Sequence, residues 1–588
     1  LLSGGDSAVI LATSREPLRL PEEHRYRLAP LPVPDLDDVD ASSLGPCIQL
    51  FSDRARRVDA EFRITPDNAA LVVGLCQRLD GLPLAIELAA SRLGSLGLVE
   101  LAETLSHRLD AIYRDHRDAD ARHQSLRSTV EWSYRLLPDR ARPLFDAMSR
   151  FPGGLRLADV IALGERLGID DDADALLSQL VDASMLHAVD GPQGRRYRML
   201  ETLRHFGAEQ VEQDDDVSAV VDRALLEHAQ ALAAAERDSW TGSPAAVRPA
   251  RSLRDEIPNL RAAREVMFDH GELAALARLS VDLTLFTEQA CLGELWGWHD
   301  ELVARRSEFE GDAAVDVDLL ATTADRNAGR LDSAIAMANA VIEASASPWT
   351  EALAWHQTAM SRLYAGELLG AVDAWDRFDQ LSGLCVGRIF GAMCLGYAGR
   401  LDEAEARLDR CHLVLDGGHP FMVAGYHYVA GELARLAGSP TARESFERGV
   451  ATCLEHDLRF TLGICRVSLA SLLAAEGDDR AAATTFVELI EQWLRSGAWP
   501  QLWITLRNAG ELLAEVDPAT SLLIWASADS DPQATAMDAD AAEHLEKLRE
   551  TCRERCGRDE AELVEKSARR TSRKDVVSRA LVALNAIS

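Results

Sequence analysis

A short motif recurs five times in the second half of the chain and constrains the fold more than any other feature. In each copy a glycine follows an alanine or a glutamate, and an alanine-rich amphipathic segment follows two or three turn residues. The copies begin at Ala328, Ala365, Ala398, Ala437 and Glu476, with their glycines 37, 33, 39 and 39 residues apart. This pattern is typical of tetratricopeptide-like (TPR-like) helix pairs, in which the glycine ends one helix and begins the corner. One pair cannot bury its apolar face alone, so the sequence predicts an α-solenoid over residues 220–545.

A solenoid of this kind presents a concave surface, which favours a role in binding. We expect a protein partner or a small signal on the TPR-like array, with self-association as a further possibility and a purely structural scaffold as the alternative. Seven tryptophans could line a groove, although most should belong to the core: Trp349, Trp355, Trp375, Trp493, Trp499, Trp503 and Trp525. The dispersed histidines form no catalytic or metal-binding pattern in the sequence.

The start of the chain predicts a buried strand. Residues 9–12 are a continuous apolar run, which suits a parallel sheet covered on both faces. Arg15 follows at the carboxyl end of this strand, where α/β proteins bind ligands, and an arginine there can bind a phosphate through two hydrogen bonds. An ordinary surface arginine after a core strand is the alternative.

A helix corner is predicted at Gly81-Leu82-Pro83. Thr65 and Pro66 fit the start of the first helix, Gly81 fits its left-handed C-cap, and Pro83 fits the first turn of the next helix. The corner has a plain structural explanation. It could also present Pro83 and its apolar neighbours to an adenine ring.

Five segments in a fixed order carry a resemblance to a known family. They are LATSREPL, LFSDRAR, CQRLDGLPLAIELAASRL, HQSLRSTVEWSYRLL and RYRMLETLRHFGAEQ. Together they resemble the STAND-type (NB-ARC/AAA-like) regulatory ATPases found among actinobacterial transcriptional regulators. The resemblance covers residues 1–213 and extends more weakly beyond them.

The resemblance implies a nucleotide site. The arginine after the strand would be the γ-phosphate sensor, which is Arg15 here, and Gly81, Leu82 and Pro83 would line the adenine site. ATP or ADP would be the cofactor of the complete protein. The first lysine of this chain is Lys547, so the chain has no P-loop lysine in the ATPase portion, and it also lacks the acidic magnesium strand. We therefore expect the C-terminal portion of a larger protein, with no hydrolysis by this chain alone.

Residues 119–215 predict a winged helix that does not read DNA. Helical segments precede two short strands joined by DGPQG, with Arg195, Arg196 and Arg198 on the predicted wing. Residues 170–184 contain five aspartates and no basic residue, so a recognition helix there would repel a duplex. The arginines are expected to solvate the hairpin. By resemblance, Met199, Leu200 and Glu201 match a Met-His-Asp motif that contacts ADP, and Leu200 cannot make a histidine's phosphate contact.

The predicted fold class is mainly α, with five parts. These are the end of an α/β NTPase domain (1–40), a helical lid (41–118), a winged helix (119–215), TPR-like repeats (220–545) and C-terminal helices (546–588). The net charge of −33 opposes binding to nucleic acid and to anionic membranes. The cysteines are scattered along the sequence, which favours reduced thiols and a cytoplasmic protein. The predicted function is a signal-transduction module of a STAND-type regulator. The alternatives are a nucleotide-independent TPR-like adaptor and a DNA-binding winged-helix activator.

Overall fold

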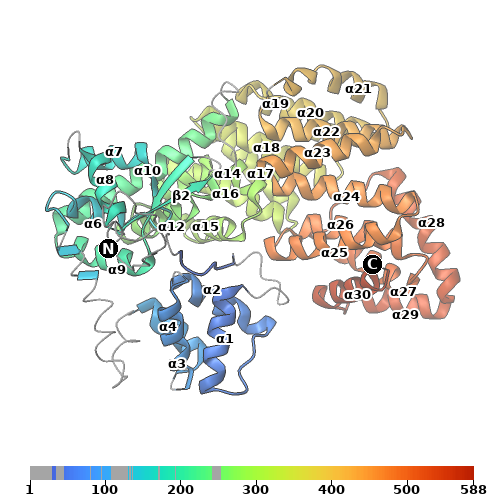
Figure 1. Ribbon diagram of the computed structural model, residues 1–588. Coiled ribbons are helices and arrows are strands. Elements are labelled where there is room, and N and C mark those ends of the chain that lie inside the picture. The colour runs from blue at the N-terminus through green and yellow to red at the C-terminus, as the bar shows by residue number, and fades with distance from the viewer. Residues whose placement is uncertain are drawn as a thin grey trace, which may run out of the picture. The chain divides into compact units, whose positions relative to one another are not determined.

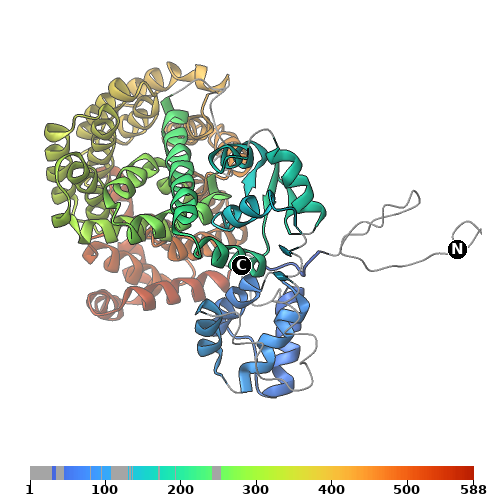
Figure 2. The same cartoon turned by 90° about the vertical axis from the view of Figure 1, so that its left-hand side faces the viewer.

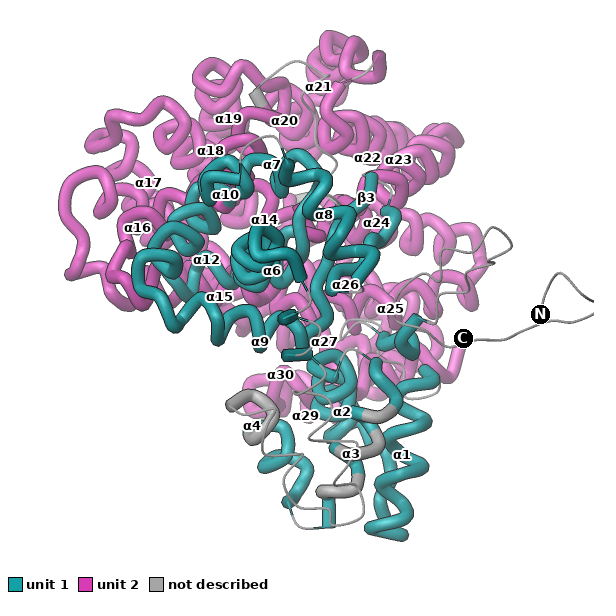
Figure 3. Tube along the Cα trace, turned by 60° about the vertical axis from the view of Figure 1, so that its left-hand side comes forward, with its two compact units in different colours: residues 1–228, 256–266 teal, residues 229–255, 267–588 magenta. Residues whose placement is uncertain are grey.

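The computed structural model describes residues 29–34, 45–107, 130–241 and 253–587, except positions 80, 95, 132–133, 136, 170–171, 184, 192–193 and 417. This part of the chain is mainly α-helical, as predicted, with TPR-like helix pairs in its second half. It divides into two compact units, residues 1–228 with 256–266 and residues 229–255 with 267–588 (Figure 3). The strand predicted at residues 9–12, and Arg15 after it, lie outside the described residues.

A group of short helices begins the first unit. They are α1 (Pro46–Val58), α2 (Pro66–Arg78), α3 (Pro83–Ser91), the 3-10 helix η3 (Arg92–Gly94) and α4 (Leu98–His107). They pack around their own apolar core, which includes Phe51, Val73, Ile86 and Leu101. Thr65 is the N-cap of α2, as the sequence predicts, and its backbone N–H donates to the Asn68 side chain at 2.8 Å.

A small antiparallel sheet with helices follows. The elements are α6 (Arg142–Met148), β1 (Leu155–Arg156), α7 (Leu157–Arg166), α8 (Ala173–Asp182), β2 (His187–Gly191), β3 (Gly194–Arg198) and α9 (Glu201–Val211). The strand order is β1-β3-β2, and Tyr197 pairs with Leu155 on one side and Ala188 on the other. The predicted hairpin is therefore present, and Asp172 is the N-cap of α8.

Helices make up the rest of the chain. The stretch before the repeats consists of α10 (Asp215–Thr241), α12 (Ile257–Asp269), α13 (Leu273–Asp282), α14 (Thr284–Ala290), α15 (Gly293–Ala304) and η6 (Arg306–Glu308). The repeats consist of α16 (Gly311–Asn327), α17 (Leu331–Ala344), α18 (Pro348–Tyr364), α19 (Leu368–Ser382), α20 (Val386–Tyr397), α21 (Leu401–Asp409), η7 (His412–Leu415), α22 (Pro420–Leu436), α23 (Ala442–His456), α24 (Arg459–Ala475) and α25 (Asp479–Ser496). The last helices are α26 (Trp499–Leu513), α27 (Pro518–Ser530), α28 (Ala539–Cys556), α29 (Arg558–Ala568) and α30 (Arg573–Asn585). None of the described helices has the length and hydrophobicity that a membrane span requires.

The five predicted repeat corners are confirmed. Gly329, Gly366, Gly399, Gly438 and Gly477 all have a left-handed backbone, with φ between 65° and 86°. In each corner the N–H of the residue after the glycine donates to the carbonyl oxygen five residues earlier, as Arg330 does to Asp325 at 2.9 Å. This hydrogen bond closes the preceding helix in the Schellman pattern, and glycine is favoured there because it adopts a positive φ without strain.

Successive helices of the second unit pack on one another from α16 to α27. Figure 1 shows these antiparallel pairs, and in Figure 2 they follow one another around the unit from yellow-green through yellow and orange to red. The last helices share one apolar core with α25–α27, which includes Trp493, Trp525, Cys552 and Val576. The array therefore continues into the C-terminal helices without a break in its core.

Candidate functional site

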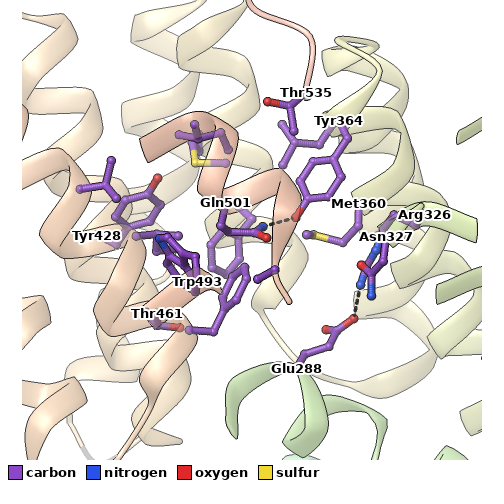
Figure 4. Close-up of a pocket in the computed structure, with 18 of the residues that line it drawn as sticks. Glu288, Arg326, Asn327, Met360, Tyr364, Tyr428, Thr461, Trp493, Gln501 and Thr535 are labelled. Atoms are coloured by element: carbon purple, nitrogen blue, oxygen red, sulfur yellow. Dashed lines mark hydrogen bonds and ion pairs between the residues drawn. The ribbon is translucent and has the colours of Figure 1, made fainter. Parts of the chain in front are cut away.

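The second unit contains a partly open cavity of about 1310 Å³. Its lining side chains come from helices between α10 and α28 and from the segment after α27, and Figure 4 shows part of the wall. Small-molecule sites usually measure about 300–1,000 Å³, so this cavity can hold a larger ligand or a segment of polypeptide.

Glu288 of α14 is the centre of one buried polar cluster in the wall. Its Oε1 accepts hydrogen bonds from Arg326 Nη2 at 2.9 Å and from Gln357 Nε2 at 3.2 Å, and its Oε2 lies 3.1 Å from His356 Nε2. Burial by itself raises the pKa of Glu288, but the charges of Arg326 and His356 outweigh it and hold that pKa well below its usual range. Glu288 is therefore an ionised group inside the array, with its charge compensated (Figure 4).

A second cluster surrounds Glu432 of α22. Its Oε2 accepts hydrogen bonds from the Tyr397 hydroxyl at 2.9 Å and from Arg435 Nη2 at 2.8 Å, and its Oε1 accepts one from the Ser468 hydroxyl. Burial, together with the Glu432 carboxylate, raises the pKa of Tyr397 well above its usual value. Tyr397 therefore stays a neutral donor, and the charge of Glu432, like that of Glu288, is compensated within its cluster.

Neither cluster was predicted, although the sequence contains a signal for both. Arg326 and Arg435 each lie three residues before a repeat glycine, near the end of the first helix of a pair. Arg326 at this position is buried and Arg435 is partly exposed, and each pairs with a buried or nearly buried carboxylate. The partners, Glu288 and Glu432, could not be assigned from the motif because they lie outside it.

Polar contacts across the cavity join distant segments. The Gln501 side chain on α26 donates to the Tyr364 hydroxyl on α18, 137 residues away, and Figure 4 shows this bond. The Thr461 hydroxyl on α24 donates to Gln289 Oε1 on α14 at 2.8 Å. These contacts bring the later helices back onto the earlier ones and close the array around the cavity.

The remaining lining is aromatic, amidic and nearly balanced in charge. Six carboxylates and five guanidinium groups line the cavity, so it does not attract a highly charged ligand. Five carboxamide side chains can both donate and accept hydrogen bonds there: Gln289, Asn327, Gln501, Asn508 and Gln533. Among the tryptophans considered from sequence, Trp375 and Trp493 line the cavity, whereas Trp503 and Trp525 are core residues outside it.

The residues predicted to form a nucleotide site differ in what the structure shows of them. Arg15 lies outside the described residues. Gly81 has the predicted left-handed backbone, with φ of 64°, and its carbonyl oxygen accepts a hydrogen bond from the Leu31 N–H at 2.9 Å. A Cβ on Gly81 would meet the Leu31 carbonyl oxygen at 2.1 Å, so the open side of this glycine is filled by the chain itself. Leu82 is half-buried, and Pro83 is exposed at the start of α3. Of the three, Pro83 offers the face that an adenine ring could contact.

Two of the arginines on the predicted wing, Arg195 and Arg196, are paired with acidic residues of the chain. Arg195 forms an exposed ion pair with Asp190 at 2.8 Å. Arg196 is buried and pairs with Glu256 at 2.6 Å, so the expectation that it solvates the hairpin is wrong. The reason is that its guanidinium also donates to the Gly154 carbonyl oxygen at 2.8 Å, which anchors β3 internally. Glu201, in the predicted ADP-contacting motif, is engaged by Arg204 and by His205 at 3.0 Å.

Sequence comparisons find similar proteins in Mycobacterium. No family model matches the chain. The chain is 35% identical over 308 residues to "Putative HTH-type transcriptional regulator Rv0890c" of Mycobacterium tuberculosis, a match that covers 52% of this chain and 33% of that protein. It is 34% identical over 229 residues to "Uncharacterized protein Rv0894" of the same organism, covering 38% of this chain and 55% of that protein. The matches thus span about a third and about half of the length of these relatives.

The comparison with solved structures includes two matches with low TM-scores. One is a Rap protein complexed with Competence and Sporulation Factor, with a TM-score of 0.43 and 13% identity, covering 60% of this chain and 99% of that one. The other is a STAND protein with a tetratricopeptide repeat sensor from Pyrococcus horikoshii, with a TM-score of 0.31 and 12% identity, covering 92% of this chain and 74% of that one.

Proposed function

We propose that this chain is the signal-transduction module of a STAND-type regulator of transcription, in which the TPR-like array binds a partner or signal. The observation that carries the proposal is the cavity inside the array, whose wall holds two charge-compensated clusters around the largely buried carboxylates Glu288 and Glu432. Burying an ion pair costs desolvation energy, and well-packed apolar residues would often stabilise a core as well or better. A binding function explains why ionised groups line a space within the array that a purely structural core would fill.

The similarity to regulators in Mycobacterium supports the transcriptional part of the proposal. The nucleotide part rests on the resemblance in the first 213 residues. In the complete protein, Arg15 would sense the γ-phosphate of ATP, and Pro83, with Leu82 and Gly81 behind it, would lie against the adenine ring. Binding of the nucleotide and binding of the signal, in different parts of the chain, would then shift the same equilibrium between two conformations of the protein.

Complementation in the organism that makes the protein tests both parts. Deletion of the gene should change a set of transcripts, and the unmodified gene should restore them. Met360→Trp places a larger side chain in the cavity wall and should fail to restore the set, at equal protein level. Leu413→Trp introduces the same residue at a position that is 67% exposed, and should restore it. Full restoration by Met360→Trp would contradict a signalling role of the cavity.

Arg15→Ala, in the same assay, separates the proposed function from the adaptor alternative. The proposal expects it to disturb the transcript set, because nucleotide state would no longer reach the output. If Arg15→Ala restores the set while Met360→Trp does not, the nucleotide-independent adaptor is correct.

A further inference from the structure

The segment Asp531–Asp538, between α27 and α28, runs as non-helical chain across the repeat array, and we call it the strap. It contacts residues that lie far earlier in the sequence. The Ala536 N–H donates to the Tyr364 carbonyl oxygen at 2.8 Å, and the Gln533 side chain donates to the Asn327 carbonyl oxygen, 206 residues away. Arg507 of α26 donates to the Thr535 carbonyl oxygen. The strap is therefore held through its main chain as well as its side chains.

The strap lies on the first two repeat corners. A Cβ on Gly329 would stand 1.9 Å from the Pro532 carbonyl oxygen, and a Cβ on Gly366 would stand 3.2 Å from the Ala536 Cβ. At the other three repeat glycines, a Cβ would meet no described atom within 4 Å. Two of the five equivalent corners therefore lie against the strap, and at Gly329 the approach is so close that only a residue without a Cβ permits it.

One end of the strap is clamped by the last helix. Arg573 of α30 binds both carboxylate oxygens of Asp531, at 2.5 and 2.8 Å, and also donates to Gln533 Oε1. Its guanidinium lies 4.8 Å from the centre of the Trp499 ring, in a cation–π contact. A bidentate arginine with a stacked ring is a specific attachment, and it uses a charge at the end of the strap.

The middle of the strap has no charge. Its sequence is Pro-Gln-Ala-Thr-Ala-Met, and Gln533, Thr535, Ala536 and Met537 line the cavity. The array thus holds an uncharged, non-helical chain, which turns at Pro532–Gln533, through carbonyl oxygens at the ends of α16 and α18 and through Arg507. This matches the carboxamide groups and balanced charge of the rest of the wall.

We propose that the corners at Gly329 and Gly366, with Arg507, form a binding site for an uncharged, non-helical peptide segment of a partner protein, and that the strap is its internal occupant. The partner segment displaces the strap, and the clamp at Arg573 sets how readily this happens. The inference deepens the proposed function by naming the partner's chemistry, but the strap's contacts stand independently of any role in transcription.

The first experiment supplies the strap in trans. A fluorescent peptide with the sequence of residues 530–539 is titrated against the chain and against a variant whose strap is replaced by eight glycine and serine residues. The replaced variant should bind the peptide at least about tenfold more tightly than the unmodified chain, because a tethered segment competes at high effective concentration. Circular dichroism and thermal unfolding verify that the variant is folded. Equal binding by both proteins, or no binding by the folded variant, would overturn the proposal.

Matched glycine variants locate the site. In the strap-replaced background, Gly329→Ala should weaken peptide binding at least about tenfold, because the new Cβ occupies the position of the peptide carbonyl oxygen. Gly399→Ala places the same methyl group at an open corner with φ of 74°, against 77° at Gly329, so it controls for backbone strain. Peptide with Ala536→Trp should also bind more weakly, because the ring cannot lie against Gly366. Equal binding by the two glycine variants would exclude this site.

Arg573→Ala keeps the proposal testable if the strap-replaced variant does not fold. This change leaves the strap in place and removes its clamp, so the intact chain should bind the peptide more tightly than the unmodified chain. Faster hydrogen exchange at the Ala536 amide should accompany it. Slow exchange together with unchanged binding would show that the strap is a fixed structural loop. These readouts require no transcriptional response, so they distinguish failure of the peptide site from failure of the proposed function.

Discussion

Glu256 shows how a single buried carboxylate organises part of the first unit. Its Oε1 accepts a hydrogen bond from Arg196 Nη1 at 2.6 Å, and its Oε2 accepts one from Asn259 Nδ2 at 2.7 Å and lies 3.3 Å from His228 Nε2. Asn259 also accepts a hydrogen bond from the Gly153 N–H at 2.8 Å. The network therefore ties α10 and α12 to the loop before β1.

Replacing Glu256 by Gln should destabilise the first unit by about 3–5 kcal/mol near neutral pH, because Arg196 would remain buried without its counter-charge. Burial raises the pKa of Glu256, but hydrogen bonds from His228 and Arg196 outweigh it and lower that pKa to about 2, from 4.5. Because the folded-state pKa is depressed, the stabilisation is present above about pH 4.5 and is lost as the pH falls toward 2. Urea unfolding at several pH values should show the difference between the two proteins shrinking below pH 4.5. Asp190→Asn, which breaks the exposed pair with Arg195, should have little effect, and a constant difference across this range would contradict the assignment.

Two identical pentapeptides show what the sequence could predict and what it could not. Ala-Gly-Arg-Leu-Asp begins at residues 328 and 398, and both copies form the predicted left-handed corner. The local sequence is sufficient for the corner because the conformation depends on hydrogen bonds within a few residues. It gives no indication that Gly329 lies under the strap and Gly399 does not. That difference depends on Pro532, about 200 residues away, as the cavity also depends on such pairs as Gln289 with Thr461.

Several helix pairs share a packing contact between a glycine and an aromatic ring, although the positions of these residues do not repeat at a fixed interval in the sequence. On three of the first helices, a glycine faces an aromatic ring of the following helix: Gly431 with Phe446, Gly463 with Trp493, and Gly510 with Trp525. A Cβ at any of these glycines would lie 2.2–2.6 Å from a ring atom. The glycines therefore accommodate large rings within closely spaced helices, at a cost in helix propensity.

Gly463→Ala should destabilise the second unit by about 1–3 kcal/mol, although alanine favours helix more than glycine does. The added methyl group would stand 2.2 Å from Trp493, which is fully buried and donates a hydrogen bond to the Thr505 hydroxyl at 3.0 Å, so the ring cannot easily move. Gly297→Ala is the matched control, because Gly297 is an exposed helical glycine whose Cβ would meet no described atom within 4 Å. It should stabilise the chain by up to about 1 kcal/mol. Denaturant unfolding measures both, and a stabilising Gly463→Ala would contradict this packing.

At the scale of the whole molecule, the net charge favours some of the candidate functions over DNA binding. The chain carries a net charge of −33, which repels a polyanion such as DNA. Only a local cluster of basic residues on the surface would overcome this repulsion. The predicted wing offers little compensation, because Arg196 is buried against Glu256 and Arg195 is paired with Asp190. Asp174 and Asp182 are exposed on α8, the helix that would have to enter a groove. These features favour signalling through proteins over DNA binding by this chain.

The chain should therefore bind duplex DNA more weakly than the roughly 10⁻⁴–10⁻⁶ M typical of non-specific binding at physiological salt. Fluorescence anisotropy of a labelled duplex, measured between about 50 and 200 mM salt, tests this, because phosphate contacts by Lys and Arg give a steep salt dependence in that range. Neutralising α8 with Asp174→Asn and Asp182→Asn should leave binding undetectable, since the buried Arg196 is still unavailable. Binding by the double variant alone would mean that α8 faces DNA and that its acidic residues prevent contact. Binding by the unmodified chain with a steep salt dependence would instead favour the winged-helix activator over the signalling module.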